Sequence, residues 1–179
     1  MRVVPDHDVN ELRRFVRDVP DFPTPGILFR DITPLLASPE AFASSIDAMA
    51  GPFREIPARK VVGIEARGFM FGAALARELG LGFVPARKAG KLPGRTERIS
   101  YGLEYGSNVL EVHADAFSPG EPVLIVDDVL ATGGTAAAAA ELVERLGARV
   151  TGLTFCIELA DLQGRSKLPG RRIHAVLVL

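Results

Sequence analysis

Cysteine is almost absent from this sequence, because Cys156 is the only one among its 179 residues. A single cysteine excludes an internal disulfide framework, and no cluster of Cys and His residues with metal-ligand spacing occurs. Cys156 lies in the apolar run 153–157, so we expect it to be a small, buried core residue. This cysteine usage is typical of a protein in the reducing cytosol.

Long apolar runs and an excess of charge of one sign are also missing. No run of about 18 apolar residues is present, which argues against a membrane-spanning helix, and the N-terminus lacks the apolar block of a signal peptide. The formal net charge is −1, so there is no bulk positive field for nucleic acid or anionic lipid. We therefore expect a cytoplasmic protein that binds neither nucleic acid nor membranes.

Alternating strand and helix patterns begin at Lys60. We expect strands at 61–64, 82–86, 123–126, 149–159 and 173–179, and helices at 68–79 and 136–146. Strands separated by helices predict an α/β fold with a parallel, doubly wound sheet flanked by helices, in one domain that spans residues 1–179. Ligands of such sheets bind beyond the C-terminal ends of the strands.

The N-terminal segment is less regular. Apolar residues at helical spacing predict a helix over 8–18, with its arginines on a solvated face. Three prolines then exclude regular structure from the segment 20–26. Ser38 followed by Pro39 predicts the start of a further helix, because serine is a favoured N-cap and proline a favoured first helical residue.

The segment 87–98 is polar, cationic and rich in glycine and proline, so we expect a mobile loop. Strand patterns at 99–105 and 108–113 follow, joined around Gly106 and Ser107. A flexible cationic loop can close over a polyanion and exclude water from a reaction.

The stretch 123–135 combines a strand, a turn and a helix start. The apolar run 123–126 predicts a strand buried on both faces, Asp127 and Asp128 end it, and a Thr-Gly-Gly-Thr turn at 132–135 leads into an alanine-rich helix. Backbone N–H groups of such a turn and the positive end of the helix dipole form an anion site. The two acids would repel a phosphate, so their partners should be hydroxyl groups or a divalent cation. One phosphate beside a diol and a metal suggests a ribose 5-phosphate.

A second strand, turn and helix start occurs at 63–69, and in the expected sheet it ends at the same edge. Arg67 lies beside this helix N-terminus and adds a guanidinium group to a second anion site. The purely structural alternatives are an ordinary βα unit for the first stretch and a helix cap with Arg67 in a salt bridge for the second.

The stretch 123–135 resembles the PRPP-binding motif of type I phosphoribosyltransferases, and 63–69 resembles their pyrophosphate loop. Residues of about 20–36 and 87–106 are similar to the base-recognition segment and the hood of the adenine phosphoribosyltransferase branch of that family. The resemblance covers about residues 19–160. It implies the type I phosphoribosyltransferase fold with a flexible hood loop, and a cis peptide in the pyrophosphate loop.

The resemblance also implies roles for individual residues. It implies 5-phosphate and ribose binding by Asp127, Asp128, Ala131, Thr132, Gly133, Gly134 and Thr135, and pyrophosphate binding by Arg67, Arg87, Lys88, Lys91 and Tyr105. It implies adenine binding by Leu28, Phe29 and Arg30, and a catalytic acid/base role for Glu104. Mg²⁺ would be carried by PRPP with no direct protein ligand, and the protein would be a homodimer.

On this basis we expect transfer of the 5-phosphoribosyl group of PRPP to N9 of adenine, giving AMP and pyrophosphate in purine salvage. The aromatic ring of Phe29 can stack on the base, and the backbone of residues 28–30 can pair with the adenine edge. A 6-oxopurine reverses the donor and acceptor on that edge. Two alternatives stay open: an enzyme of the same class acting on hypoxanthine, guanine, xanthine or orotate, and a non-catalytic PRPP-binding regulator.

Overall fold

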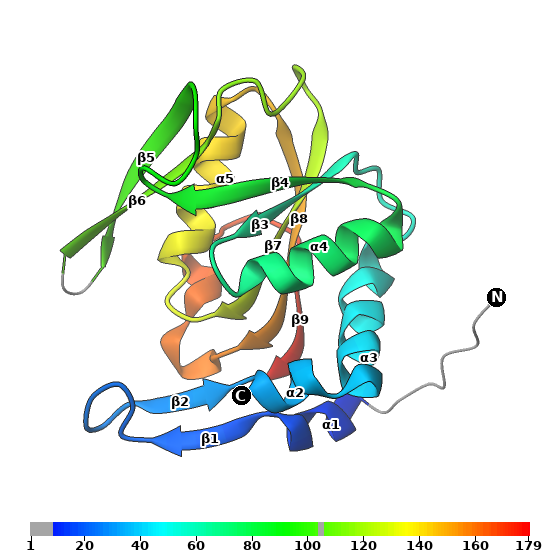
Figure 1. Ribbon diagram of the computed structural model, residues 1–179, viewed down its shortest axis with the longest axis vertical. Helices are drawn as coiled ribbons and strands as arrows, with labels where there is room; N and C mark the ends of the chain where they lie inside the picture. The colour runs from blue at the N-terminus through cyan, green and yellow to red at the C-terminus, as the bar shows by residue number, and fades with distance from the viewer. Residues whose placement is uncertain (1–8, 104–105) are drawn as a thin grey trace.

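The computed structural model of the chain describes residues 9–103 and 106–179, and its centre is a seven-stranded sheet (Figure 1). The strands are β3 (Lys60–Ile64), β4 (Gly82–Lys88), β5 (Thr96–Leu103), β6 (Gly106–His113), β7 (Pro122–Leu130), β8 (Arg149–Glu158) and β9 (Ile173–Val178). Their order in the sheet is β5-β6-β4-β3-β7-β8-β9. Neighbouring strands from β4 to β9 are parallel, whereas β6 is antiparallel to both β4 and β5. The predicted parallel, doubly wound sheet is confirmed, and an antiparallel hairpin extends it at one edge.

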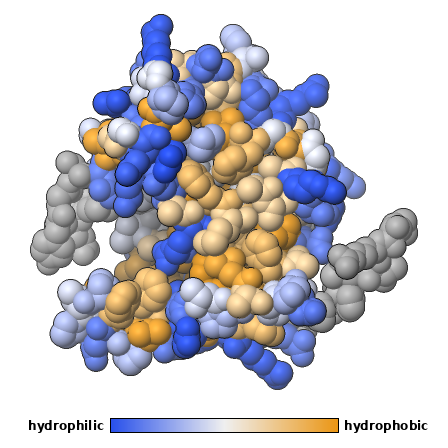
Figure 2. All heavy atoms as spheres, viewed as in Figure 1, coloured by the Kyte–Doolittle hydropathy of each residue, from blue (hydrophilic) through white to orange (hydrophobic). Residues whose placement is uncertain are grey.

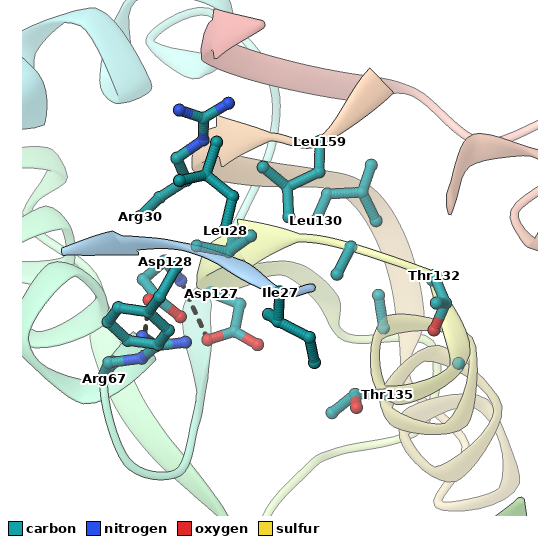
Figure 3. Close-up of a pocket in the computed structure, with 16 residues that line it drawn as sticks. Ile27, Leu28, Arg30, Arg67, Asp127, Asp128, Leu130, Thr132, Thr135 and Leu159 are labelled. Atoms are coloured by element: carbon teal, nitrogen blue, oxygen red, sulfur yellow. Dashed lines mark hydrogen bonds and ion pairs between the residues drawn. The ribbon is translucent and has the colours of Figure 1, made fainter. Parts of the chain in front are cut away.

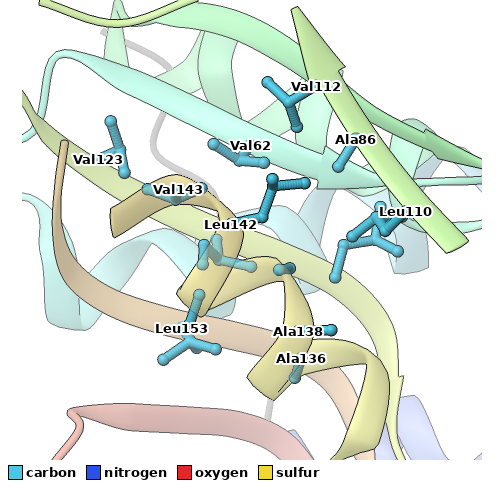
Figure 4. Close-up of a cluster of buried hydrophobic side chains, with 14 of the residues drawn as sticks. Val62, Ala86, Leu110, Val112, Val123, Ala136, Ala138, Leu142, Val143 and Leu153 are labelled. Carbon is cyan, nitrogen blue, oxygen red and sulfur yellow. The ribbon is translucent and has the colours of Figure 1, made fainter. Parts of the chain in front are cut away.

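Helices cover both faces of this sheet. They are α3 (Pro39–Ala50), α4 (Gly68–Leu79) and α5 (Gly134–Arg145). Helices α3 and α4 lie on one face and α5 on the other (Figure 1). Because alternate residues of a strand point to opposite faces, Val61 packs with α3 and α4, whereas Val62 packs with Leu142 and Val143 of α5 (Figure 4). Burial on both faces explains why the strand sequences are apolar throughout. Within the described ranges, no helix combines the length and apolarity needed to cross a bilayer.

The N-terminal segment forms its own small layer below the sheet in Figure 1. It consists of α1 (Val9–Leu12), the 3₁₀ helix η1 (Arg13–Phe15), β1 (Arg17–Pro20), β2 (Leu28–Asp31) and α2 (Thr33–Ala37). The helix predicted over 8–18 is wrong beyond Phe15, because β1 pairs with β2 in an antiparallel ribbon. Across this ribbon, a guanidinium nitrogen of Arg17 lies 2.6 Å from the carboxylate of Asp31. Pairing with a distant segment has overridden the local helical pattern.

The predicted cationic loop over 87–98 is shorter in the structure. Strand β4 extends to Lys88 and β5 starts at Thr96, so both ends of the predicted loop are strand. The strand pair that follows is confirmed, but residues 106–107 belong to β6 and pair with β5. Residues 104–105, the end of the first predicted strand, lie outside the described residues.

The buried side chain of Glu111 in β6 holds the connection between β4 and β5 in place. Its carboxylate accepts hydrogen bonds of 3.0 Å from the N–H groups of both Lys91 and Leu92. A guanidinium nitrogen of Arg98 lies 3.0 Å from its other oxygen. Burial alone would raise the pKa of Glu111, but the N–H groups of Leu92, Gly90 and Lys91, together with Arg98, lower it below its usual value. The cationic segment is therefore held by a carboxylate that sequence alone did not indicate.

Helix boundaries follow the predicted capping residues. The hydroxyl of Ser38 accepts a hydrogen bond of 3.2 Å from the N–H of Ala41, and Pro39 is the first residue of α3. Helix α4 ends before Gly80, which adopts a left-handed conformation with φ +68°. Helix α5 begins at Gly134, earlier than the alanine run predicted.

Cys156 lies in β8 and is fully buried, as predicted. Burial and the nearby negative charge of Asp128 raise the pKa of its thiol to about 12, so the reactive thiolate does not form at neutral pH. We expect no reaction of the native protein with Ellman's reagent at neutral pH, and reaction of the single thiol in denaturant. A native protein that reacted as fast as the denatured chain would contradict this prediction.

Candidate active site

A cavity of about 310 Å³ lies beyond the C-terminal ends of β3 and β7. These neighbouring parallel strands end at the same edge of the sheet, as predicted. The cavity is lined by the end of β7, by the turn 131–135, by Arg67 and, from the N-terminal ribbon, by residues 27–30 (Figure 3). Segments far apart in sequence therefore surround one space, and every residue predicted for ribose, 5-phosphate and adenine binding lines it.

Asp127 and Asp128 lie within β7 and do not end it. The strand continues to Leu130 because β8 keeps pairing alongside it, from Phe155 opposite Asp127 to Glu158 opposite Leu130. Asp128 is only 3% exposed, whereas Asp127 is partly exposed. The adjacent carboxyl groups are therefore held on a paired strand and not on a loop.

The two carboxyl groups are electrostatically strained. The Nε atom of Arg67 lies 2.8 Å from Oδ2 of Asp128 as an ion pair, but the geometry is not that of a hydrogen bond. This buried oxygen thus has no hydrogen-bond donor among the described residues. Burial and the neighbouring charge of Asp128 raise the pKa of Asp127 well above its usual value. Burial also raises the pKa of Asp128, although Arg67 opposes the change. A ligand that donates a hydrogen bond to Oδ2 of Asp128 would satisfy this buried acceptor.

The turn 131–135 leads directly into the N-terminus of α5. Gly133 has φ +78°, and a Cβ atom on it would lie 2.2 Å from the carbonyl oxygen of Gly164. Gly164 begins the 3₁₀ helix η4 (Gly164–Lys167), which follows β8. The hydroxyl of Thr135 lies 3.4 Å from the hydroxyl of Tyr101, at hydrogen-bond distance. The turn is therefore supported from behind by η4, a contact that sequence reasoning did not predict.

The predicted pyrophosphate residues lie in different surroundings. Arg67 lines the cavity, and its guanidinium carbon lies 5.4 Å from the centre of the Phe29 ring. Arg87 lies outside the lining and donates two hydrogen bonds of 3.1 Å to Glu65, the residue whose peptide bond to Ala66 is cis. The side chains of Lys88 and Lys91 are exposed outside the cavity, whereas Tyr105 and the proposed catalytic Glu104 lie outside the described residues.

The β1–β2 ribbon forms the wall opposite the phosphate turn. The rings of Phe22 and Phe29 meet edge to face with their centres 5.1 Å apart, and a guanidinium nitrogen of Arg30 lies 2.5 Å from the carboxylate of Asp18. Ile27, Val129, Leu130, Ala136 and Leu159 also line the cavity and were not predicted. Ile27 lies within the adenine-like stretch and could have been found, but Leu159 becomes part of the wall only because β8 runs beside β7.

Comparison with known proteins places this geometry in a family. Residues 32–171 match the family model described as the phosphoribosyl transferase domain. A protein of Carboxydothermus hydrogenoformans named adenine phosphoribosyltransferase is 57% identical over 167 residues, which are 93% of this chain and 98% of that protein. The chain belongs to the adenine phosphoribosyltransferase family. A relative of the same name from Acidothermus cellulolyticus is 55% identical over 175 residues, which are 97% of this chain and 99% of the relative.

Solved structures of adenine phosphoribosyltransferases share this fold. The enzyme of Rhodothermus marinus superposes with a TM-score of 0.91 at 54% identity, covering 96% of this chain and 98% of that one. The enzyme of Saccharomyces cerevisiae, solved with adenine and an imino-altritol bisphosphate, gives a TM-score of 0.89 at 46% identity, covering 94% of this chain and 98% of that one. The type I phosphoribosyltransferase fold is therefore confirmed.

Proposed function

We propose that this protein transfers the 5-phosphoribosyl group of PRPP to N9 of adenine, giving AMP and pyrophosphate in purine salvage. The observation that carries this proposal is the buried Oδ2 of Asp128, which lacks a hydrogen-bond donor among the described residues, in a cavity between a glycine turn and an aromatic wall. Groups suited to a phosphate, a diol and a planar base thus surround one space. Membership of the adenine phosphoribosyltransferase family supports the same reaction.

The phosphate turn and the acids would bind the ribose 5-phosphate part of PRPP. Backbone N–H groups of 131–135 and the hydroxyls of Thr132 and Thr135 would bind the 5-phosphate at the positive end of α5. Asp127 and Asp128 would accept hydrogen bonds from the ribose hydroxyls. Their negative charge would also stabilise the positive charge that develops on the ring as pyrophosphate leaves. Positioning and electrostatics would supply most of the rate, since no covalent enzyme intermediate is needed.

The β2 segment would select the base. The backbone C=O and N–H groups of residues 28–30 would pair with the exocyclic amine and N1 of adenine, and Phe29 would stack on the ring. A 6-oxopurine presents an acceptor and a donor in the opposite order. Both backbone groups would then lose their partners, at a cost of about 1–3 kcal/mol each.

The leaving pyrophosphate would be neutralised by the basic residues of the two turns and the hood. Arg67 already lies in the cavity and would exchange its ion pair with Asp128 for the ligand. Arg87, Lys88 and Lys91 lie on β4 and the connection that follows it, and we propose that they approach the pyrophosphate together with Tyr105. Glu104 would relay the proton of the purine as an acid/base.

Mg²⁺ is the metal ion that we propose for this reaction. Within residues 9–103 and 106–179, no group of three or more His, Cys, Asp or Glu side chains could hold a metal ion. Mg²⁺ prefers octahedral oxygen coordination, keeps several water ligands and is usually bound together with substrate phosphates. We infer that the ion would be held by the pyrophosphate and ribose oxygens of PRPP, near these carboxylates. Bound in this way, it would neutralise the leaving group.

We also propose a homodimer that acts in the cytoplasm. Figure 2 shows an apolar area over α4, where Met70 is 41% exposed and the neighbouring Phe83 of β4 is 37% exposed. Exposed apolar patches of this kind mark interaction sites. Sedimentation at micromolar concentration should give the mass of two chains, and the mass of one chain would contradict the proposal.

The activity itself is tested by release of pyrophosphate from PRPP and Mg²⁺ with several bases in parallel. We expect release with adenine, and rates lower by about 100-fold or more with hypoxanthine, guanine, xanthine and orotate, because of the unpaired backbone groups. Release with another base at a rate comparable to that with adenine would contradict the specificity argument. No release with any base, together with measurable PRPP binding, would favour a regulator. Full turnover by Glu104→Gln would exclude the acid/base role of Glu104.

A further inference from the structure

We infer that Lys167 is a further ligand of the 5-phosphate, an inference that rests on the proposed phosphate site. Lys167 is the last residue of η4, the 3₁₀ helix behind the phosphate turn. Its Nζ atom lies 3.9 Å from the position that a Cβ atom on Gly134 would occupy, in the first turn of α5. A charged amine is therefore present beside the backbone N–H groups that would bind the phosphate.

The phosphate turn has no cation of its own. Residues 131–136 are uncharged. The two arginines that line the same cavity are already paired, Arg30 with Asp18 at 2.5 Å and Arg67 with Asp128 at 2.8 Å. A phosphate monoester carries a charge of about −1.5 to −2 at neutral pH, whereas a helix N-terminus offers only about +0.5. An additional positive charge at the turn would improve this balance.

Within residues 9–103 and 106–179, Lys167 has no partner that would explain its position. Among the described residues, none forms an ion pair or a hydrogen bond with its amine, which is exposed. A cation beside the N-terminus of a helix is disfavoured, because the helix dipole places positive charge there. Lys167 itself does not line the cavity, but its Nζ atom approaches Gly134, which does. The buried Asp128 oxygen that lacks a donor lies in that cavity and separately indicates a missing hydroxyl donor, such as a ribose hydroxyl. A bound phosphate would turn the unfavourable lysine position into a favourable one.

The backbone on both sides of Lys167 is held in place. A Cβ atom on Gly164 would lie 2.3 Å from the carbonyl oxygen of Ala131, so η4 packs directly on the phosphate turn. Arg165 donates hydrogen bonds of 2.7 Å and 2.6 Å to the buried carboxylate of Glu158. Leu168 is 2% exposed and belongs to the core cluster under α5. No described residue holds the side chain of Lys167, whereas its main chain is fixed, which is the arrangement expected of a binding residue.

Binding of ribose 5-phosphate and of pyrophosphate, measured separately by calorimetry, tests this inference. We expect Lys167→Ala to weaken ribose 5-phosphate about tenfold, the loss of one charge-assisted hydrogen bond, and to change pyrophosphate affinity by less than about twofold. Lys167→Arg should keep affinity for ribose 5-phosphate within about threefold of wild type. In turnover, Lys167→Ala should raise the KM for PRPP about tenfold, with little change in kcat or in the KM for adenine.

Arg149→Gln provides the matched control, because it removes one positive charge at the start of β8, the opposite end of the strand from the site. It should leave the affinity for both ligands unchanged. Lys167→Met, which keeps an apolar stem, should reproduce Lys167→Ala if the alanine variant folds poorly. Unchanged ribose 5-phosphate affinity in both variants, or equal losses for the two ligands, would overturn the role of Lys167. Failure of the wild type to bind ribose 5-phosphate would instead overturn the proposed phosphate site, and the inference with it.

Discussion

Gly133→Ala is expected to lower the midpoint of thermal unfolding by about 6–12 °C and turnover by about 100-fold or more. Two costs combine at this position. The backbone has φ +78°, a left-handed conformation that costs a residue with a Cβ atom about 1–2 kcal/mol. The new methyl group would also lie 2.2 Å from the carbonyl oxygen of Gly164, and neither main chain can move without distorting the turn. Calorimetry and pyrophosphate release measure the two effects.

Gly120→Ala separates the two costs. Gly120 has a similar φ of +72°, but a Cβ atom there would meet nothing within 4 Å. This control should lose only the conformational part, about 1–2 kcal/mol or about 2–8 °C, and keep full activity. If Gly133→Ala lowered the unfolding midpoint and turnover no more than Gly120→Ala, the close contact with Gly164 would contribute to neither stability nor activity.

Asp127→Asn is expected to make the protein more stable at neutral pH while reducing turnover by about 100-fold. Burial raises the pKa of Asp127 well above its usual value, and the charge of Asp128 raises it further. When folding raises the pKa of a carboxyl group, the protein loses stability as the pH rises from the pKa of the unfolded state through that of the folded state. Asparagine removes that charge and keeps an oxygen to accept the 2.9 Å hydrogen bond from the N–H of Asp128. The ribose hydroxyl would then lose its charged acceptor.

Unfolding curves at several pH values test the origin of this gain. At neutral pH we expect a gain in the free energy of unfolding, because folding raises the pKa of the wild-type carboxyl group and asparagine removes its charge. The gain should shrink as the pH falls below the raised pKa, because the wild-type carboxyl group is then neutral as well. Asp115→Asn removes an exposed carboxylate and should change stability by less than about 0.5 kcal/mol. A loss of stability in Asp127→Asn at neutral pH would show that the carboxylate is not strained.

The parts of the fold that were predictable depend on local patterns. Apolar runs such as 123–126 identify strands wherever both faces are buried, and residues such as Ser38 and Gly80 mark helix ends through their own backbone chemistry. The strand, turn and helix start at 123–135 also carries its anion site locally. For this reason the cavity contains the residues of this stretch that were predicted for phosphate and ribose binding.

The features that were missed depend on contacts between distant segments. Strand β1 is mostly exposed and has no strand pattern of its own, so only its pairing with β2 reveals it. Asp127 and Asp128 look like a strand end, but β8 continues beside them and keeps them in the sheet. The burial of Glu111 and the contact of Gly164 with the phosphate turn likewise arise from packing, and a charged residue or a single glycine gives no sequence signal for either.

The contact between Gly133 and Gly164 also bears on the stage of synthesis at which the chain can bind its ligand. The ribosome releases β7, the phosphate turn and α5 before η4, and a domain generally folds as a unit. A nascent chain at that stage has every residue of the anion turn but lacks η4, which supports the turn from behind. We therefore expect ligand binding to begin only when nearly the whole chain has emerged. A premature stop codon before Gly164 would remove binding even where the preceding sheet and helices could still form.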